Sequence, residues 1–158
     1  PRVRRQRQMC IRDRERTAAE VLHVTPFNSY PSEITATASK RAEYIRWAQK
    51  RHGFIIEDDF DSEFTLLSKP EDTLFSLAPQ KQIIYMNSFS KTIAPAIRAA
   101  YLVLPEPLLA AYQEKIGFYS CTVPVFEQLV LAEFINGGHF ERHINRIRRQ
   151  RRKALQGK

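Results

Sequence analysis

Short apolar runs alternate along the chain with longer segments in which apolar residues recur at helical spacing. The apolar runs are typical of buried strands, and the periodic segments are typical of helices. Strands that alternate with helices predict an α/β fold, a three-layer α/β/α domain with a mostly parallel sheet. We expect strands at 21–24, 54–58, 82–87 and 98–104, and helices at 39–52, 105–118, 124–136 and from 139 onward.

The expected helices have boundaries and buried faces that can be read from residue types. Ser39 is a candidate N-cap for the first helix, and Gly53 a candidate stop after His52. Two later helices are expected to be buried through apolar rows, and the last one to be apolar on one side only. These rows are Leu108, Leu109, Tyr112 and Ile116; Val125, Phe126, Leu129, Val130 and Phe134; and Phe140, Ile144 and Ile147.

Composition narrows the class of protein. The 158 residues are 43% hydrophobic, which is typical of one globular domain with a core. No apolar run approaches the roughly 18 residues that a membrane span needs, and no signal peptide is recognisable. Cys10 and Cys121 have neither metal-ligand nor disulfide spacing, which favours a reducing cytoplasm.

The positive charge is concentrated at the two ends. Of the net charge of +8, residues 1–16 carry +5 and residues 139–158 carry +7, so the middle is acidic. Basic ends can contact a polyanion, but no aromatic residues interleave with the first arginines and no nucleic-acid reader motif is present. We therefore favour a solvated face over nucleic-acid binding. Residues 1–16 also lack any strand or helix period, and we interpret them as a tail foreign to the domain.

A polar cluster, Asn87-Ser88-Phe89-Ser90-Lys91-Thr92, follows the expected strand 82–87. Open α/β sheets bind ligands where their strands end. A lysine held there, partly out of water, can act as an amine nucleophile, and nearby hydroxyls and Arg98 are suitable donors to a phosphate. An amine beside a phosphate site suggests a lysine Schiff base with pyridoxal 5'-phosphate (PLP).

A second stretch places carboxylates after a strand. Gly53-Phe54-Ile55-Ile56-Glu57-Asp58-Asp59-Phe60-Asp61-Ser62-Glu63-Phe64 supplies the anion that the PLP pyridine nitrogen requires. Its acidic residues lack the spacing of a calcium loop, and His139 with His143 lacks a third ligand. We therefore predict no metal site.

Together the two motifs resemble the PLP-dependent fold-type-I aminotransferases, and most of all the aminotransferase-like domain of MocR/GabR-type regulators. In that domain Ile-Ile-Glu-Asp-Asp-Tyr-Asp-Ser-Glu-Phe and Ser-Phe-Ser-Lys-Thr recur. The resemblance runs from about Val21 to Arg152. It implies a partial large domain over 17–138, with 139–158 as the helix that leads toward a small C-terminal domain.

The resemblance also implies roles for individual residues. Lys91 forms the Schiff base and is the base at the substrate α-carbon, and Asp58 holds the ring nitrogen protonated. The remaining cofactor-binding residues would be Ser88, Ser90 and Arg98 at the phosphate, Asn28 in the loop near the ring, and Phe60 at the place of the family tyrosine.

Two functions follow from this resemblance. One is an aminotransferase that moves an amino group between an amino acid and a 2-oxo acid. The other is the effector-sensing domain of a regulator that binds DNA through a helix-turn-helix upstream of these residues. Either protein would be a homodimer, and the chain would be a fragment of it.

Overall fold

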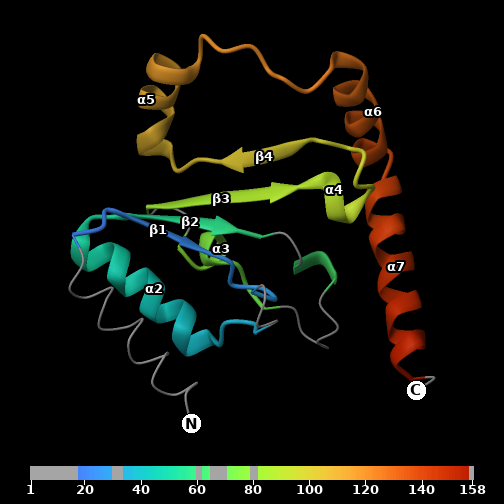
Figure 1. The fold of residues 1–158 in the computed structure, drawn as a ribbon, viewed down its shortest axis with the longest axis horizontal. Helices are drawn as coiled ribbons and strands as arrows, with labels where there is room; N and C mark the ends of the chain where they lie inside the picture. Colours follow the sequence, from blue (N-terminus) through green and yellow to red (C-terminus); the bar gives the residue numbers. More distant parts are fainter. Residues whose placement is uncertain (1–17, 30–33, 60–61, 65–70, 79–81, 157–158) are drawn as a thin grey trace.

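The computed structural model describes residues 18–29, 34–59, 62–64, 71–78 and 82–156. Its strands form one sheet in the order β1-β2-β3-β4, in which β1, β2 and β3 are parallel and β4 is antiparallel (Figure 1). The expectation of an α/β fold with a mostly parallel sheet is thereby confirmed. The strands are β1 (Val21–Val24), β2 (Phe54–Asp58), β3 (Ile83–Ser88) and β4 (Ala100–Val103).

Six helices and a short 3-10 helix connect or follow these strands in the described residues. They are α2 (Ala38–Arg51), η1 (Ser62–Phe64), α3 (Leu74–Leu77), α4 (Phe89–Thr92), α5 (Glu106–Ile116), α6 (Val125–Asn136) and α7 (His139–Gln156). The strands at 21–24 and 54–58 are confirmed to the residue, and the long helices to within a few residues. None of these helices is both long and apolar enough to cross a membrane.

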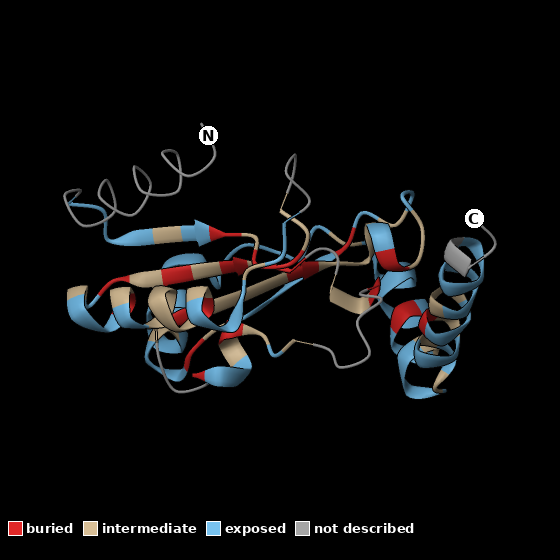
Figure 2. Cartoon of the chain, turned by 90° about the horizontal axis from the view of Figure 1, so that it is seen from below, coloured by how far each residue is buried: buried red, intermediate tan, exposed pale blue. Residues whose placement is uncertain are grey.

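The core lies between one face of the sheet and helices α2 and α3. Val24, Ile55 and Ile83 from three adjacent strands are buried against Ala48 of α2 and Leu74 of α3. Successive side chains of a strand point to opposite faces, so the residues next to Val24, Ile55 and Ile83 in their strands face away from this core. Figure 2 shows that buried residues concentrate along the sheet, whereas most of the outlying helices are exposed.

Helix α2 begins two residues earlier than the sequence suggests. Thr37, not Ser39, is its N-cap, because the Thr37 hydroxyl accepts a hydrogen bond from the Lys40 backbone N–H at 3.4 Å. The helix ends at Arg51, and its C-cap His52 has a left-handed φ of 52°. Gly53 follows because a Cβ there would lie 2.6 Å from the Glu20 carbonyl oxygen.

The predicted burial of β4, α5 and α6 is wrong for the described residues. All four residues of β4 are exposed, α5 has no buried residue, and Leu131 is the buried residue of α6. Phe126 is 77% exposed although it belongs to a clear apolar row. These elements lie on the far side of β3 from α2, where the described part of the chain places little against them (Figure 1).

Helix α7 has the predicted single apolar side. Ile144 is buried, and Phe140 and Ile147 are half-buried. His143 of this helix lies with its Nε2 3.0 Å from the Thr92 carbonyl oxygen, which attaches α7 to the end of α4. The long basic helix is therefore held beside the segment that carries Lys91.

Candidate functional site

The ends of β2 and β3 bring the two predicted motifs to one edge of the sheet. Asp58, the last residue of β2, is the register partner of Met86 in β3. Ser88 ends β3 two residues later, so its side chain points to the same face as those of Met86 and Asp58. Helix α4, which contains Lys91, begins at the next residue.

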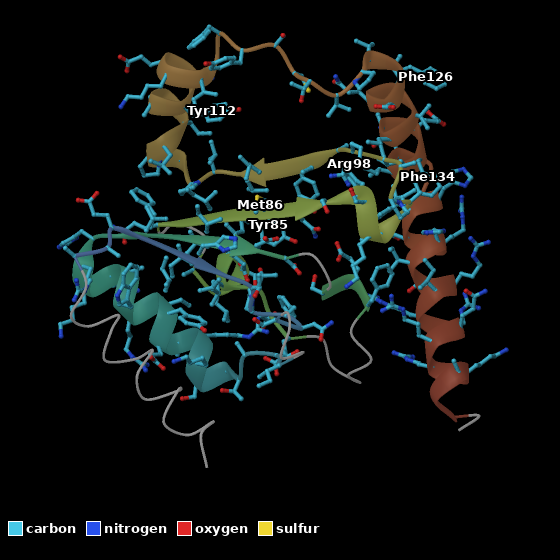
Figure 3. All side chains as sticks on the ribbon, in the orientation of Figure 1. Tyr85, Met86, Arg98, Tyr112, Phe126 and Phe134 are labelled. Carbon is cyan, nitrogen blue, oxygen red and sulfur yellow. The ribbon has the colours of Figure 1, made fainter. Side chains whose placement is uncertain are left out.

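Around Lys91, the chain turns back from α4 toward β4. Ser90 donates from its hydroxyl to the Ile97 carbonyl oxygen at 2.8 Å, and Arg98 donates from Nη1 to the Ser90 hydroxyl at 3.3 Å. Two of the predicted phosphate-binding residues thus lie in contact, with Ser90 in α4 and Arg98 in the connection to β4, where Figure 3 labels it. Lys91 is exposed rather than partly removed from water, so its amine is accessible from solvent.

Asp58 is partly buried and has a close basic neighbour. Its side chain is 27% exposed, and its Oδ2 lies 3.3 Å from His23 Nε2 on β1. Asp58 belongs to β2, which has β1 on one side and β3 on the other. Its side chain therefore lies at the carboxyl end of a parallel strand, which is where open α/β sheets bind their ligands.

Asn28 lies in the loop that follows β1. Its φ of 50° is left-handed, a conformation that asparagine adopts more readily than most residues, and its backbone N–H donates to the Thr35 hydroxyl at 3.3 Å. Phe27, 3% exposed, lies 4.3 Å beneath the Arg41 guanidinium and anchors the loop to α2. Phe60 lies outside the described residues, and its role stays a prediction.

A buried polar network beneath the strand ends was not predicted from the sequence. Asp59 is fully buried and accepts hydrogen bonds from the Ser62 hydroxyl at 2.6 Å and the Tyr85 hydroxyl at 2.8 Å. Asn87, also buried, donates from Nδ2 to Glu63 Oε1 at 2.7 Å. Burial, reinforced by the Asp59 charge, raises the pKa of Tyr85, so this hydroxyl remains protonated as a donor.

The same network reaches helix α7. Arg148 donates from Nε to the Glu63 carbonyl oxygen, and the Arg151 guanidinium lies 4.3 Å from the centre of the Phe64 ring. Arg142 and Arg146 each contact a histidine one turn earlier on the helix. Part of the basic surface of α7 is therefore used in contacts within the domain. In the sequence, arginines interleave with the apolar residues Ile144 and Ile147, and this pattern was the sign that some of the arginines lie against the domain.

Replacing Glu63 with glutamine should stabilise the fold at pH 7. Glu63 Oε2 is buried and has no hydrogen-bond partner among the described residues, and burial raises the pKa of this carboxyl above 4.5. Because the folded pKa exceeds the unfolded one, stability falls as pH rises from 4.5 through the folded pKa. We expect Glu63→Gln to gain about 1 kcal/mol of unfolding free energy at pH 7 and almost nothing at pH 4.5.

Urea unfolding of the full-length gene product at the two pH values measures this difference. Glu20→Gln, a change of an exposed carboxylate, is the matched control and should leave stability unchanged at both. Equal stability of wild-type and Glu63→Gln protein at pH 7 would contradict the inference that the buried, unpaired Oε2 makes the charged form of Glu63 unfavourable.

Comparison with known proteins agrees with this geometry. No family model matches the chain. The chain is 37% identical over 145 residues to the HTH-type transcriptional regulator YdeL of Bacillus subtilis, which is 92% of this chain and 31% of YdeL. It is 33% identical over 128 residues to PdxR of Corynebacterium glutamicum, a pyridoxine biosynthesis transcriptional regulator, and 27% identical over 139 residues to MocR of Rhizobium meliloti.

Several solved structures with a similar fold are aminotransferases. LysN of Thermus thermophilus, an α-aminoadipate aminotransferase complexed with N-(5'-phosphopyridoxyl)-L-leucine, matches with a TM-score of 0.77 and 26% identity. The match covers 90% of this chain and 37% of LysN. The chain has the fold of part of a fold-type-I aminotransferase-like domain, and its sequence is similar to that of MocR-type regulators. It spans about a third of the length of the proteins that it matches.

Proposed function

We propose that this domain binds PLP at the ends of β2 and β3. The observation that carries the proposal is the register of these strands, which places Asp58 opposite Met86 and Ser88 on the same face, next to the helix with Lys91. PLP bound there would supply a ring that withdraws electrons from the substrate α-carbon. The donor set suits this cofactor, because it combines an accessible amine, a carboxylate and a hydroxyl–guanidinium pair.

Within this proposal each residue has a separate task. Lys91 offers its amine for covalent attachment of the cofactor and moves a proton at the substrate α-carbon. Asp58 keeps the pyridine nitrogen protonated. The phosphate is held by Ser88, Ser90 and Arg98. The guanidinium of Arg98 has forked donors that suit a phosphate, and its contact with the Ser90 hydroxyl places it beside that residue. Asn28 lines the ring from its loop, and Phe60 stands in the sequence where the resembled family has the tyrosine that bonds the ring oxygen.

The reaction that fits these tasks is transfer of an amino group between an amino acid and a 2-oxo acid. A second function is favoured by the sequence relatives, which are HTH-type regulators. In that case the domain senses PLP or an amino acid with little turnover, and DNA is bound by a part of the protein outside these residues. In both cases we propose a cytoplasmic homodimer.

The two functions separate in one pair of measurements on the full-length gene product with PLP. An aminotransferase releases a 2-oxo acid from an amino acid over many turnovers. A regulator releases no more than one equivalent per PLP and binds a promoter fragment with an affinity that changes when PLP is added. Multiple turnover without any DNA binding would exclude the regulator.

Covalent labelling tests PLP binding itself. Borohydride makes the link between an amine and the PLP aldehyde permanent, so the modified lysine can be found by mass spectrometry of peptides. With substoichiometric PLP we expect Lys91 to be labelled at least about tenfold more than other exposed lysines, because its site adds binding energy. Lys50 and Lys115, which are also exposed, serve as internal controls. Equal labelling of all three lysines would overturn the proposal.

A further inference from the structure

His23 lies beside Asp58, although the sequence places it inside an ordinary core strand. Its Nε2 is 3.3 Å from Asp58 Oδ2. The contact is a result of the strand register: His23 is the partner of Ile56 in the parallel β1–β2 pair, and Asp58 lies two residues further along the same face. The pairing of the two strands therefore sets this contact, without any loop.

We propose that His23 is a positioning residue that holds the Asp58 carboxylate for the PLP pyridine nitrogen. This inference rests on the role proposed above for Asp58. An ionised carboxylate only accepts hydrogen bonds, so in this role His23 Nε2 carries the proton and donates it to Asp58 Oδ2. With Oδ2 held by His23, the carboxylate has a fixed orientation in which Oδ1 remains for the cofactor, and less freedom is lost when PLP binds.

Packing does not account for His23. Its side chain is 55% exposed, and Val21, on the same face of β1 two residues earlier, is 50% exposed. The buried residue of this strand is Val24, which points to the opposite face. Among the described residues, the contact with Asp58 is the polar interaction that the structure gives this side chain.

The expected effect is moderate, because both partners are partly exposed and compete with water. In the full-length gene product, His23→Leu should weaken PLP binding about three- to fivefold, as measured by titration of the visible absorbance of bound PLP. His23→Gln should restore most of the affinity, since a glutamine amide nitrogen takes the place of Nε2. In an Asp58→Ala background, the His23→Leu change should have no further effect.

Val21→Thr is the matched control on the same strand and face, and it should leave PLP affinity unchanged. Wild-type protein that does not bind PLP would overturn the proposed function and the role of His23 with it. Wild-type binding with an unchanged His23→Leu variant, or an equal loss in the Asp58→Ala background, would overturn the role of His23 alone. If the Asp58→Ala protein binds PLP too weakly to titrate, an equal loss of PLP affinity in His23→Leu and His23→Gln would overturn the role of His23.

Discussion

Replacement of Lys91 with alanine should remove the visible absorbance band of bound PLP and the borohydride-stable label together. Lys91 is the lysine that the described residues place beside the strand ends of Asp58 and Ser88, so we expect no other described residue to take over covalent attachment. Any amino transfer should fall by at least about 10³-fold, because the same change removes the base at the α-carbon. Non-covalent binding of the phosphate by Ser90 and Arg98 should persist at higher PLP concentration.

Two variants separate the amine from other properties of the side chain. Lys91→Arg retains the positive charge but offers no amine of ordinary nucleophilicity, so it should lose the absorbance band as completely as Lys91→Ala. Lys115→Ala, at another exposed lysine, should behave as wild type. Because Lys91 is exposed, neither Lys91 variant should change the urea midpoint appreciably. A band that survives in Lys91→Ala would assign the attachment to another residue.

The elements that set this strand edge could be predicted because their signals are local. The run from Phe54 to Asp58 is apolar and bounded by Gly53 and a group of carboxylates, and it forms a strand with those bounds. The strand predicted at 82–87 also forms, one residue later along the chain, as Ile83–Ser88. Parallel neighbours must align their carboxyl ends, so the proximity of Asp58 and Ser88 followed once both strands were assigned to one parallel sheet.

Burial of the later elements could not be predicted in the same way. The rows through Tyr112 and Phe126 show which side of each helix is apolar, but periodicity does not identify the surface that covers it. Tyr112 is 41% and Phe126 77% exposed. Leu102 illustrates the same point in β4, since an apolar strand at the edge of the described sheet has neighbours on one side only.

The polar network was missed for a different reason. Tyr85 and Asp59 are 26 residues apart in sequence, and Asn87 and Glu63 are 24 apart, so no local pattern connects them. Tyr85 was read as part of an apolar strand, and its hydroxyl gave no local sign of a partner. The prediction of Ser39 rather than Thr37 as the N-cap of α2 was wrong for a similar reason, because both residues are suitable caps and only the fold selects one.

Glu57 is expected to be the residue of largest effect on stability. It is fully buried on β2, and its two carboxylate oxygens accept from the backbone N–H groups of Leu74 at 2.7 Å and Phe75 at 2.9 Å. These are the first N–H groups of α3, which have no partner within the helix. Burial raises the pKa of this carboxyl above 4.5, while the two N–H groups act in the opposite direction and favour its charge.

Glu57→Ala should therefore lower the free energy of unfolding by about 2–4 kcal/mol, because it leaves two buried donors without acceptors and opens a cavity beside Leu74. Urea unfolding of the full-length gene product at pH 7 measures this loss. Thr73→Ala is the matched control at the same helix end. It removes the hydroxyl that accepts from the Ser76 N–H at 3.0 Å in an exposed setting and should cost about 1 kcal/mol.

The difference between these two variants tests how β2 and α3 are joined. If Glu57→Ala costs no more than Thr73→Ala, the carboxylate is only a local cap, and α3 docks through Leu74 alone. A loss two- to fourfold larger means that the strand with Asp58 at its end is held to the core by its own buried carboxylate one residue earlier. The position of Asp58 at the sheet edge would then depend on Glu57, so Glu57→Ala should also weaken PLP binding.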